Sequence, residues 1–176
     1  ELAQRLLHNT EGEVLFDNFS RGLYSTDASI YQIKPVGVVV PKSKQDVEAA
    51  LGIARDAGVS VTMRGAGTSQ CGQTVGEGLI VDFSKHLNQL VSMDSENQRA
   101  VVQPGIVLDQ LNALLKSYGL FFPVDVSTSS RATIGGMTAN NSCGARSIRY
   151  GKMVDNVWAV DAILADGQPM HFCEWQ

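Results

Sequence analysis

The fold is decided at residues 63–73, which read Met63-Arg64-Gly65-Ala66-Gly67-Thr68-Ser69-Gln70-Cys71-Gly72-Gln73. This stretch follows an apolar, β-branched run at residues 59–63 that predicts a strand. Its glycines let the backbone turn sharply and expose several N–H groups in one direction. Such a concave group of donors binds anionic oxygen, and Thr68 and Ser69 add hydroxyl donors. The stretch therefore predicts a phosphate or pyrophosphate site, and the alternative is an ordinary tight turn between two strands.

Two familiar phosphate motifs fail in this loop. The dinucleotide fingerprint G-x-G-x-x-G starting at Gly65 needs glycine at position 70, where the chain has Gln70. A P-loop starting at Gly67 reaches Gly72 but has Gln73 where the phosphate-binding lysine belongs. Both near misses favour a different phosphate-binding architecture. A nucleotide-binding module without redox chemistry remains an alternative.

The surrounding residues predict strands alternating with helices. Residues 36–40 form a β-branched run between Pro35 and Pro41, which is typical of a buried strand. Ser43 and Asp46 match an S-x-x-D cap, and apolar residues at helical spacing continue to Gly58. Further along, we expect a strand at 79–82, a hairpin of 89–93 with 99–103, a helix from 108 to 119, and a strand at 157–165 that turns at 166–167.

The first 34 residues are predicted to form an N-terminal arm. Leu2, Leu6 and Leu7 indicate a short helix. Residues 18–31 are rich in Ser, Gly, Asp and Tyr, and this composition predicts a loop-like stretch.

A second segment, residues 121–144, reads FFPVDVSTSSRATIGGMTANNSCG. It is crowded with small and hydroxyl-bearing residues, and Gly135-Gly136 permits close approach of the backbone to a flat ligand. A planar ring with polar edges, such as a flavin, needs such a surface. The alternative is a loop and a helix start that merely pack tightly.

Composition excludes some classes of function. The formal net charge is -4, so no basic surface suggests a nucleic acid partner. Three cysteines and three histidines are scattered, and their spacing predicts no metal site and no disulfide framework. No apolar run approaches the ~20 residues that span a bilayer.

Five features occur in a fixed order. They are the strand–helix–strand unit followed by Arg64–Ser69, Val101–Gly105, Ala132–Gly136 and Arg149–Gly151. This order resembles the FAD-binding domain of the vanillyl-alcohol oxidase (PCMH-type) flavoproteins. It is most similar to the branch with D-lactate, glycolate and D-2-hydroxyglutarate dehydrogenases. The stretch Phe19–Pro35, with Tyr24, Asp27, Ser29 and Tyr31, resembles long members of this branch, in which a C-terminal iron–sulfur domain follows the flavin domain. The resemblance implies an α+β fold of two small α/β lobes with FAD between them. We expect an arm at 1–34 and a FAD-binding domain at 35–176, incomplete at the C-terminus, in a chain that is part of a longer protein.

The resemblance also implies the cofactor contacts. Arg64–Ser69 would hold the pyrophosphate, while residues 123–129, 133–136 and 140–144 would line the flavin and its ribityl chain. The first loop has no histidine, so FAD would be non-covalent, and Cys143 is expected to be a buried small side chain. The expected cofactor-binding residues are Arg64, Gly65, Ala66, Gly67, Thr68, Ser69, Gln73, Pro123, Ser129, Thr133, Gly135, Gly136, Asn140 and Gly144.

The implied activity is oxidation of a D-2-hydroxy acid by hydride transfer to FAD. Electrons would leave through an iron–sulfur domain, a quinone or a carrier protein. The alternatives are another alcohol or amine as substrate, or a MurB-like reduction. No catalytic residue can be named. Arg131, Arg146 and Arg149 suit a phosphate or carboxylate, with surface salt bridges as the alternative. The expected location is the cytoplasm or the surface of the inner membrane.

Overall fold

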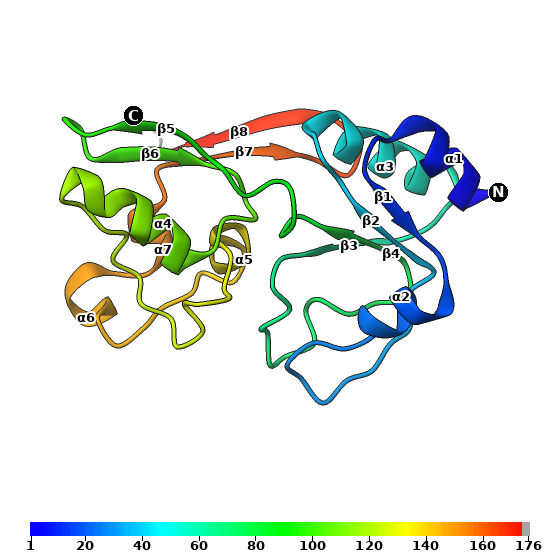
Figure 1. Cartoon of the computed structure of the whole chain (residues 1–176), viewed down its shortest axis with the longest axis horizontal. Coiled ribbons are helices and arrows are strands. Elements are labelled where there is room, and N and C mark those ends of the chain that lie inside the picture. Colours follow the sequence, from blue (N-terminus) through cyan, green and yellow to red (C-terminus); the bar gives the residue numbers. More distant parts are fainter. Residues whose placement is uncertain (174–176) are drawn as a thin grey trace.

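The computed structural model describes residues 1–173 and contains two α+β lobes side by side (Figure 1). The first lobe carries the N-terminal helices and a four-stranded sheet. The second carries a β-hairpin and short helices. A further hairpin extends from the second lobe towards the long helix of the first (Figure 1). The predicted fold class, an α+β protein with two lobes, is confirmed.

The sheet of the first lobe has the strand order β1-β2-β4-β3. Its parallel strands are β2, β4 and β3, and β1 lies antiparallel to β2. Both β2 and β4 are buried along their whole length, which explains their unbroken β-branched and aliphatic sequences. The strands are β1 (Glu13–Leu15), β2 (Gly37–Val40), β3 (Val61–Arg64) and β4 (Leu79–Asp82).

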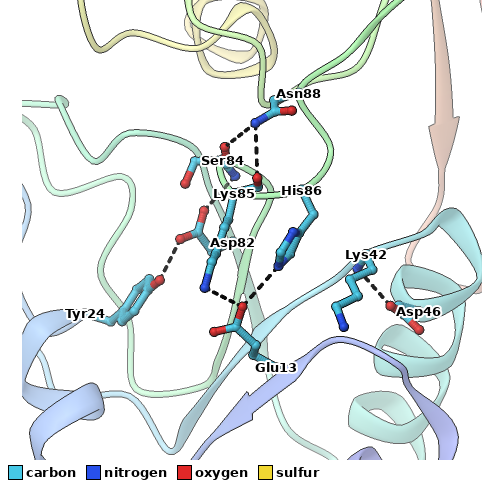
Figure 2. Close-up of polar contacts among 9 residues, drawn as sticks. All are labelled: Glu13, Tyr24, Lys42, Asp46, Asp82, Ser84, Lys85, His86 and Asn88. Atoms are coloured by element: carbon cyan, nitrogen blue, oxygen red, sulfur yellow. Dashed lines mark hydrogen bonds and ion pairs between the residues drawn. The ribbon is translucent and has the colours of Figure 1, made fainter.

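Two helices cover one face of this sheet. The first, α1 (Leu2–Asn9), buries Leu6 against α3 (Lys44–Asp56) and the sheet. The hydroxyl of Ser43 caps α3 by accepting a hydrogen bond from the N–H of Asp46. The carboxylate of Asp46 does not bond back to the start of the helix. It accepts instead from the N–H of Lys42 (Figure 2) and from the N–H of Glu11 in the arm. It thereby joins the arm to the start of α3.

The second lobe packs around its own apolar core. Leu108, Leu111 and Leu115 project into it from α4 (Leu108–Leu115), as their spacing predicts. The helix continues as a 3-10 turn, Lys116–Tyr118, and ends at Gly119, whose φ of 70° suits glycine. The other elements are β5 (Leu90–Asp94), β6 (Arg99–Val102), α5 (Ile134–Ala139), α6 (Ser147–Tyr150), α7 (Met153–Asn156), β7 (Ala159–Ile163) and β8 (Pro169–Cys173).

The arm differs from expectation. Residues 18–31 were expected to be loop-like, but α2 (Asn18–Leu23) lies there, capped by the Asp17 carboxylate. The arm also contributes β1, which at three residues is too short to show a period of two. With Leu6 buried as well, the arm is an integral part of the first lobe. The end of the expected domain, residue 176, lies outside the described residues.

Candidate cofactor-binding site

A cavity of about 160 Å³ lies between the first glycine-rich loop, residues 65–78, and the second segment. The loop leaves the C-terminal end of β3, the edge of a parallel sheet where ligands bind in open α/β folds. Of the expected residues, those that line the cavity are Gly65, Ala66, Gly67, Thr68, Ser69, Thr133, Gly136 and Asn140. The remaining lining comes from Thr74, Val126, Thr128, Ala132, Met137 and Ser142.

The first loop leaves its backbone donors free. Among residues 1–173, none accepts a hydrogen bond from the N–H groups of Gly65 to Gln70. Gly67 and Gly72 adopt positive φ values of 67° and 73°, a conformation that side chains disfavour. The loop therefore presents unpaired N–H groups beside a cavity, which is the donor set that a pyrophosphate requires.

The second segment uses its donors internally. The N–H of Ile134 donates to the carbonyl of Ile106 at 2.9 Å, and that of Gly135 donates to Pro104 at 2.8 Å. The Thr133 hydroxyl, almost fully buried, caps α5 by accepting from the N–H of Gly136. The start of α5 thus has no spare donor at these three positions, and it supplies a closely packed wall.

The two walls meet at glycines. A Cβ at Gly65 would overlap the hydroxyl of Thr133, so the absence of a side chain there lets the first loop approach α5. A Cβ at Gly135 would instead overlap Pro104, which does not line the cavity. Gly135 was expected to contact the cofactor, but the structure places it against protein.

A polar chain joins the walls at the mouth of the cavity. Gln73 donates its amide N–H to the Asn140 side-chain oxygen at 2.9 Å. The Ser69 hydroxyl is hydrogen-bonded to the other end of the Gln73 amide. Gln73 does not line the cavity, and it connects two residues that do.

Arg64 also lies outside the lining. Its guanidinium donates to the carbonyl oxygens of Thr26 at 2.8 Å, Thr74 at 3.2 Å and Tyr24 at 3.4 Å. It also lies over the Tyr24 ring, 5.2 Å from the ring centroid. Arg64, which was expected to bind the pyrophosphate, therefore points towards the arm.

The other expected contacts are structural in this arrangement. Gly144 packs against the Asp125 backbone and side chain, where a Cβ would overlap both. The carbonyl of Ser129 accepts from the N–H of Asp109 in α4. Pro123 is half-buried and does not line the cavity. The expectation that Cys143 is buried was wrong, because its side chain is exposed.

The guanidinium groups of Arg131, Arg146 and Arg149 do not converge on one site. Arg146 is ion-paired with Asp125 at 3.6 Å, which agrees with the salt-bridge alternative. Arg149 lies over the Tyr150 ring, 5.2 Å from its centroid. Arg131 is exposed.

Thr74 is a lining residue that the sequence did not indicate. Its hydroxyl donates to the Asp27 carboxylate at 3.0 Å, and Asp27 also accepts from the N–H of Ser29. Partial desolvation raises the pKa of Asp27, but the hydrogen bonds from Ser29 and Thr74 outweigh it and hold the pKa below its ordinary value. A Thr in a glycine-rich loop carries no signal for a partner 47 positions away.

Residues 83–89, between β4 and β5, form the linker between the lobes. A polar cluster lies where β4 leads into this linker (Figure 2). The buried Asp82 carboxylate accepts from the Tyr24 hydroxyl at 2.7 Å and from the N–H of Ser84 at 2.8 Å. Burial, together with the bond to Asp82, raises the pKa of Tyr24. Tyr24 therefore stays a neutral donor to the carboxylate.

The linker is also attached to β1. The Glu13 carboxylate contacts the Lys85 ammonium at 2.6 Å and His86 Nε2 at 3.0 Å (Figure 2). Hydrogen bonds from Lys85 and then from His86 hold the pKa of Glu13 below its ordinary value. The arm therefore contacts both the first loop and the linker.

The site suits a ligand with a pyrophosphate and a flat ring. It offers free N–H groups, the hydroxyl of Thr68, and a wall of small residues. The family profile described as FAD binding domain matches residues 35–172. The chain belongs to the FAD-binding domain family.

Relatives of this family member include dehydrogenases of hydroxy acids. The chain is 43% identical to D-2-hydroxyglutarate dehydrogenase of Pantoea ananatis over 81% of its own length and 14% of the relative's. It is 39% identical to glycolate oxidase subunit GlcD of Bacillus subtilis over 92% of its own length and 35% of the relative's. The chain spans only 14% to 16% of the length of the D-2-hydroxyglutarate dehydrogenases that it matches.

Solved structures share the fold. Physcomitrella patens BBE-like 1 superimposes with a TM-score of 0.85 at 22% identity, covering 98% of this chain and 38% of that one. Arthrobacter nicotinovorans 6-hydroxy-D-nicotine oxidase gives a TM-score of 0.84 at 20% identity, covering 98% and 38%. At such identities the likeness concerns the fold.

Residues 1–173 show neither a membrane-spanning helix nor a metal-binding cluster. None of the helices there combines an apolar sequence with the length that a membrane crossing needs. His, Cys, Asp and Glu do not gather there in any group of three suited to a metal ion.

Proposed function

We propose that this chain holds FAD non-covalently in the cavity between its lobes, with residues 35–176 as the binding domain and the arm as its support. The N–H groups of Gly65 to Gln70 would bind the pyrophosphate. The residues of the second segment that line the cavity, among them Thr133, Gly136 and Asn140, would follow the ribityl chain and the flavin. The observation that carries the proposal is the row of unpaired N–H groups beside the cavity. When bound, FAD supplies a hydride acceptor.

The chain's own residues would bind and orient the cofactor. The positive φ of Gly67 turns the loop towards the cavity, and Thr133 fixes the opposite wall by capping α5. The Gln73–Asn140 hydrogen bond closes one side of the mouth. Non-covalent binding is supported by the loop at 65–78, which contains no histidine.

For the whole protein, we propose oxidation of a D-2-hydroxy acid such as D-lactate, glycolate or D-2-hydroxyglutarate. The support is the identity to relatives named for these activities. Electrons would pass to a quinone or a carrier protein, with an iron–sulfur cluster outside this chain as an intermediate carrier. The proposed location is the cytoplasm or the surface of the inner membrane.

A titration with FAD tests the binding proposal. We expect saturable one-to-one binding, followed by flavin fluorescence and the visible absorption band, with ATP as a competitor that fails to displace it. Failure of the whole protein to bind FAD would overturn the proposal, and displacement by ATP would favour the nucleotide-binding alternative. The substrate proposal is tested by anaerobic mixing of the whole protein with the three acids. Bleaching of the flavin band by one of them is expected, and bleaching by none would overturn it.

A further inference from the structure

Arg64 is the last residue of β3 and the first one before the glycine-rich loop. Its side chain is half-buried and turns away from the cavity towards the arm. Nη1 and Nη2 are hydrogen-bonded to carbonyl oxygens, two of which belong to the arm. A guanidinium whose terminal nitrogens already bind neutral carbonyls has lost much of its capacity for phosphate.

The arm touches the loop at two more points. The N–H of Ala28 donates to the carbonyl of Gly67 at 3.0 Å. The Asp27 carboxylate accepts from the Thr74 hydroxyl at 3.0 Å. Residues 24–28 therefore contact the loop near its start through Arg64, at its turn through Gly67 and near its far end through Thr74.

The arm is itself fixed to the sheet at this place. The Tyr24 hydroxyl donates to Asp82, which pairs with Arg64 across the β3–β4 ladder. The Tyr24 ring packs against Val38, Val40 and Ile80 on the face of the sheet opposite α3. Arg64 then covers the same ring. The guanidinium thus binds to a segment that is itself held on the sheet.

From these contacts we infer that Arg64 is a positioning residue: it holds the free N–H groups of the loop in place through the arm and does not contact the FAD. The inference rests on the proposed FAD site. It also explains why an arginine is suited to this position, because a lysine presents one nitrogen and cannot reach three separate carbonyls as a planar fork does.

The first test is hydrogen exchange in the whole protein without FAD. We expect Arg64→Lys to speed exchange of the Ala28 N–H, which donates to the Gly67 carbonyl, while a peptide from α4 in the second lobe exchanges as before. Arg5→Ala, which removes a surface arginine paired with Asp56, serves as the matched control. If Arg64 acted only on the cofactor, the Ala28 N–H of the apoprotein would exchange at its native rate, and that result would overturn the inference.

The second test is a double-mutant cycle on the dissociation constant of FAD. Positioning through the arm predicts that Arg64→Lys weakens FAD binding about tenfold to a hundredfold. A direct bidentate contact with phosphate would weaken binding as well, so the coupling with a second substitution in the arm decides between the two. Asp27→Ala releases the arm from Thr74 and should remove much of the effect of Arg64→Lys. Additive effects would overturn the inference. Failure of the native protein to bind FAD would instead overturn the proposed function, while the exchange test would still decide the role of Arg64.

Discussion

The first loop and the second segment have similar compositions and use them in opposite ways. Both are rich in glycine and hydroxyl residues. In the first loop the N–H groups of Gly65 to Gln70 have no acceptor within the described part of the chain, and the arm holds the loop from outside. In the second segment the N–H groups of Ile134 and Gly135 donate to the carbonyls of residues 106 and 104, and helix α5 begins there.

This difference separates binding from packing. A segment whose donors are free needs external support, because an unpaired loop gains little stability from its own backbone. A segment whose backbone donors are paired is stabilised by its own hydrogen bonds and contributes a packed surface to the cavity. Substitutions in the first loop should therefore change FAD affinity, and substitutions in the second should change the free energy of unfolding.

Gly135→Ala should give the largest effect. The new Cβ would overlap the backbone of Pro104 and strain the hydrogen bond between the two residues. We expect a loss of about 1–3 kcal/mol in the free energy of unfolding, typical of overpacking. Denaturant unfolding measures it. The matched control is Gly52→Ala in the interior of α3, where a Cβ meets nothing within 4 Å and alanine should stabilise by about 0.5–1 kcal/mol. Equal effects at both positions would contradict the assignment of Gly135 to packing.

Gly67→Ala should affect binding more than stability. Its φ of 67° disfavours alanine, and a Cβ would meet the Arg64 guanidinium. The strain of about 1–2 kcal/mol should displace the loop and raise the dissociation constant of FAD about tenfold. Gly119→Ala introduces the same strain at a φ of 70°, with open space around it, at a residue that does not line the cavity. It should lower stability without changing FAD affinity, and a change there would show that FAD binding merely follows stability.

The sequence predicted the frame of the molecule because strong local signals carry it. The run at 36–40 is buried strand, and the cap at Ser43 starts a helix that ends before Gly58. The turn at 166–167 joins β7 to β8. These signals depend on residues within one element. For this reason their boundaries shift by only a residue or two from the expected positions.

Local sequence patterns did not predict which backbone N–H and guanidinium groups bind other parts of the protein and which stay free for a ligand. Whether Gly135 faces FAD or Pro104 depends on how residues 104–106 cross the start of α5. The direction of Arg64 depends on an arm that lies 38 to 40 positions earlier. A motif identifies which residues gather at a site, whereas their partners come from tertiary packing that no local pattern encodes.

Gln73→Ala tests the one direct hydrogen bond between the side chains of the two segments. It removes the bond to Asn140 and the contact with Ser69. Since the groups are exposed, we expect the dissociation constant of FAD to rise by a factor of about 2 to 10, corresponding to roughly 0.5–1.5 kcal/mol. The control is Gln70→Ala, an exposed residue of the same loop whose side chain has no hydrogen-bond partner among residues 1–173. A native affinity in Gln73→Ala would show that the two walls bind FAD without this connection.

The smallest expected effect concerns the Asp27 carboxylate, which supports only the first loop. Its pKa is lowered in the folded state by the hydrogen bonds from Ser29 and Thr74, which overcome the opposing effect of desolvation. A lowered folded pKa means that the stabilisation is present above the unfolded value, 3.8, and disappears as the pH falls through the folded value. The gain stays below about 1 kcal/mol because the side chain is partly exposed. Asp27→Asn should therefore lower the denaturant midpoint at pH 7 and lower it by less at pH 2.5. Glu77→Gln, at an exposed position in the same loop, is the control and should lower it at neither pH. A deficit of Asp27→Asn that persisted undiminished at pH 2.5 would mean that the geometry of the side chain, and not its charge, holds the arm on the loop.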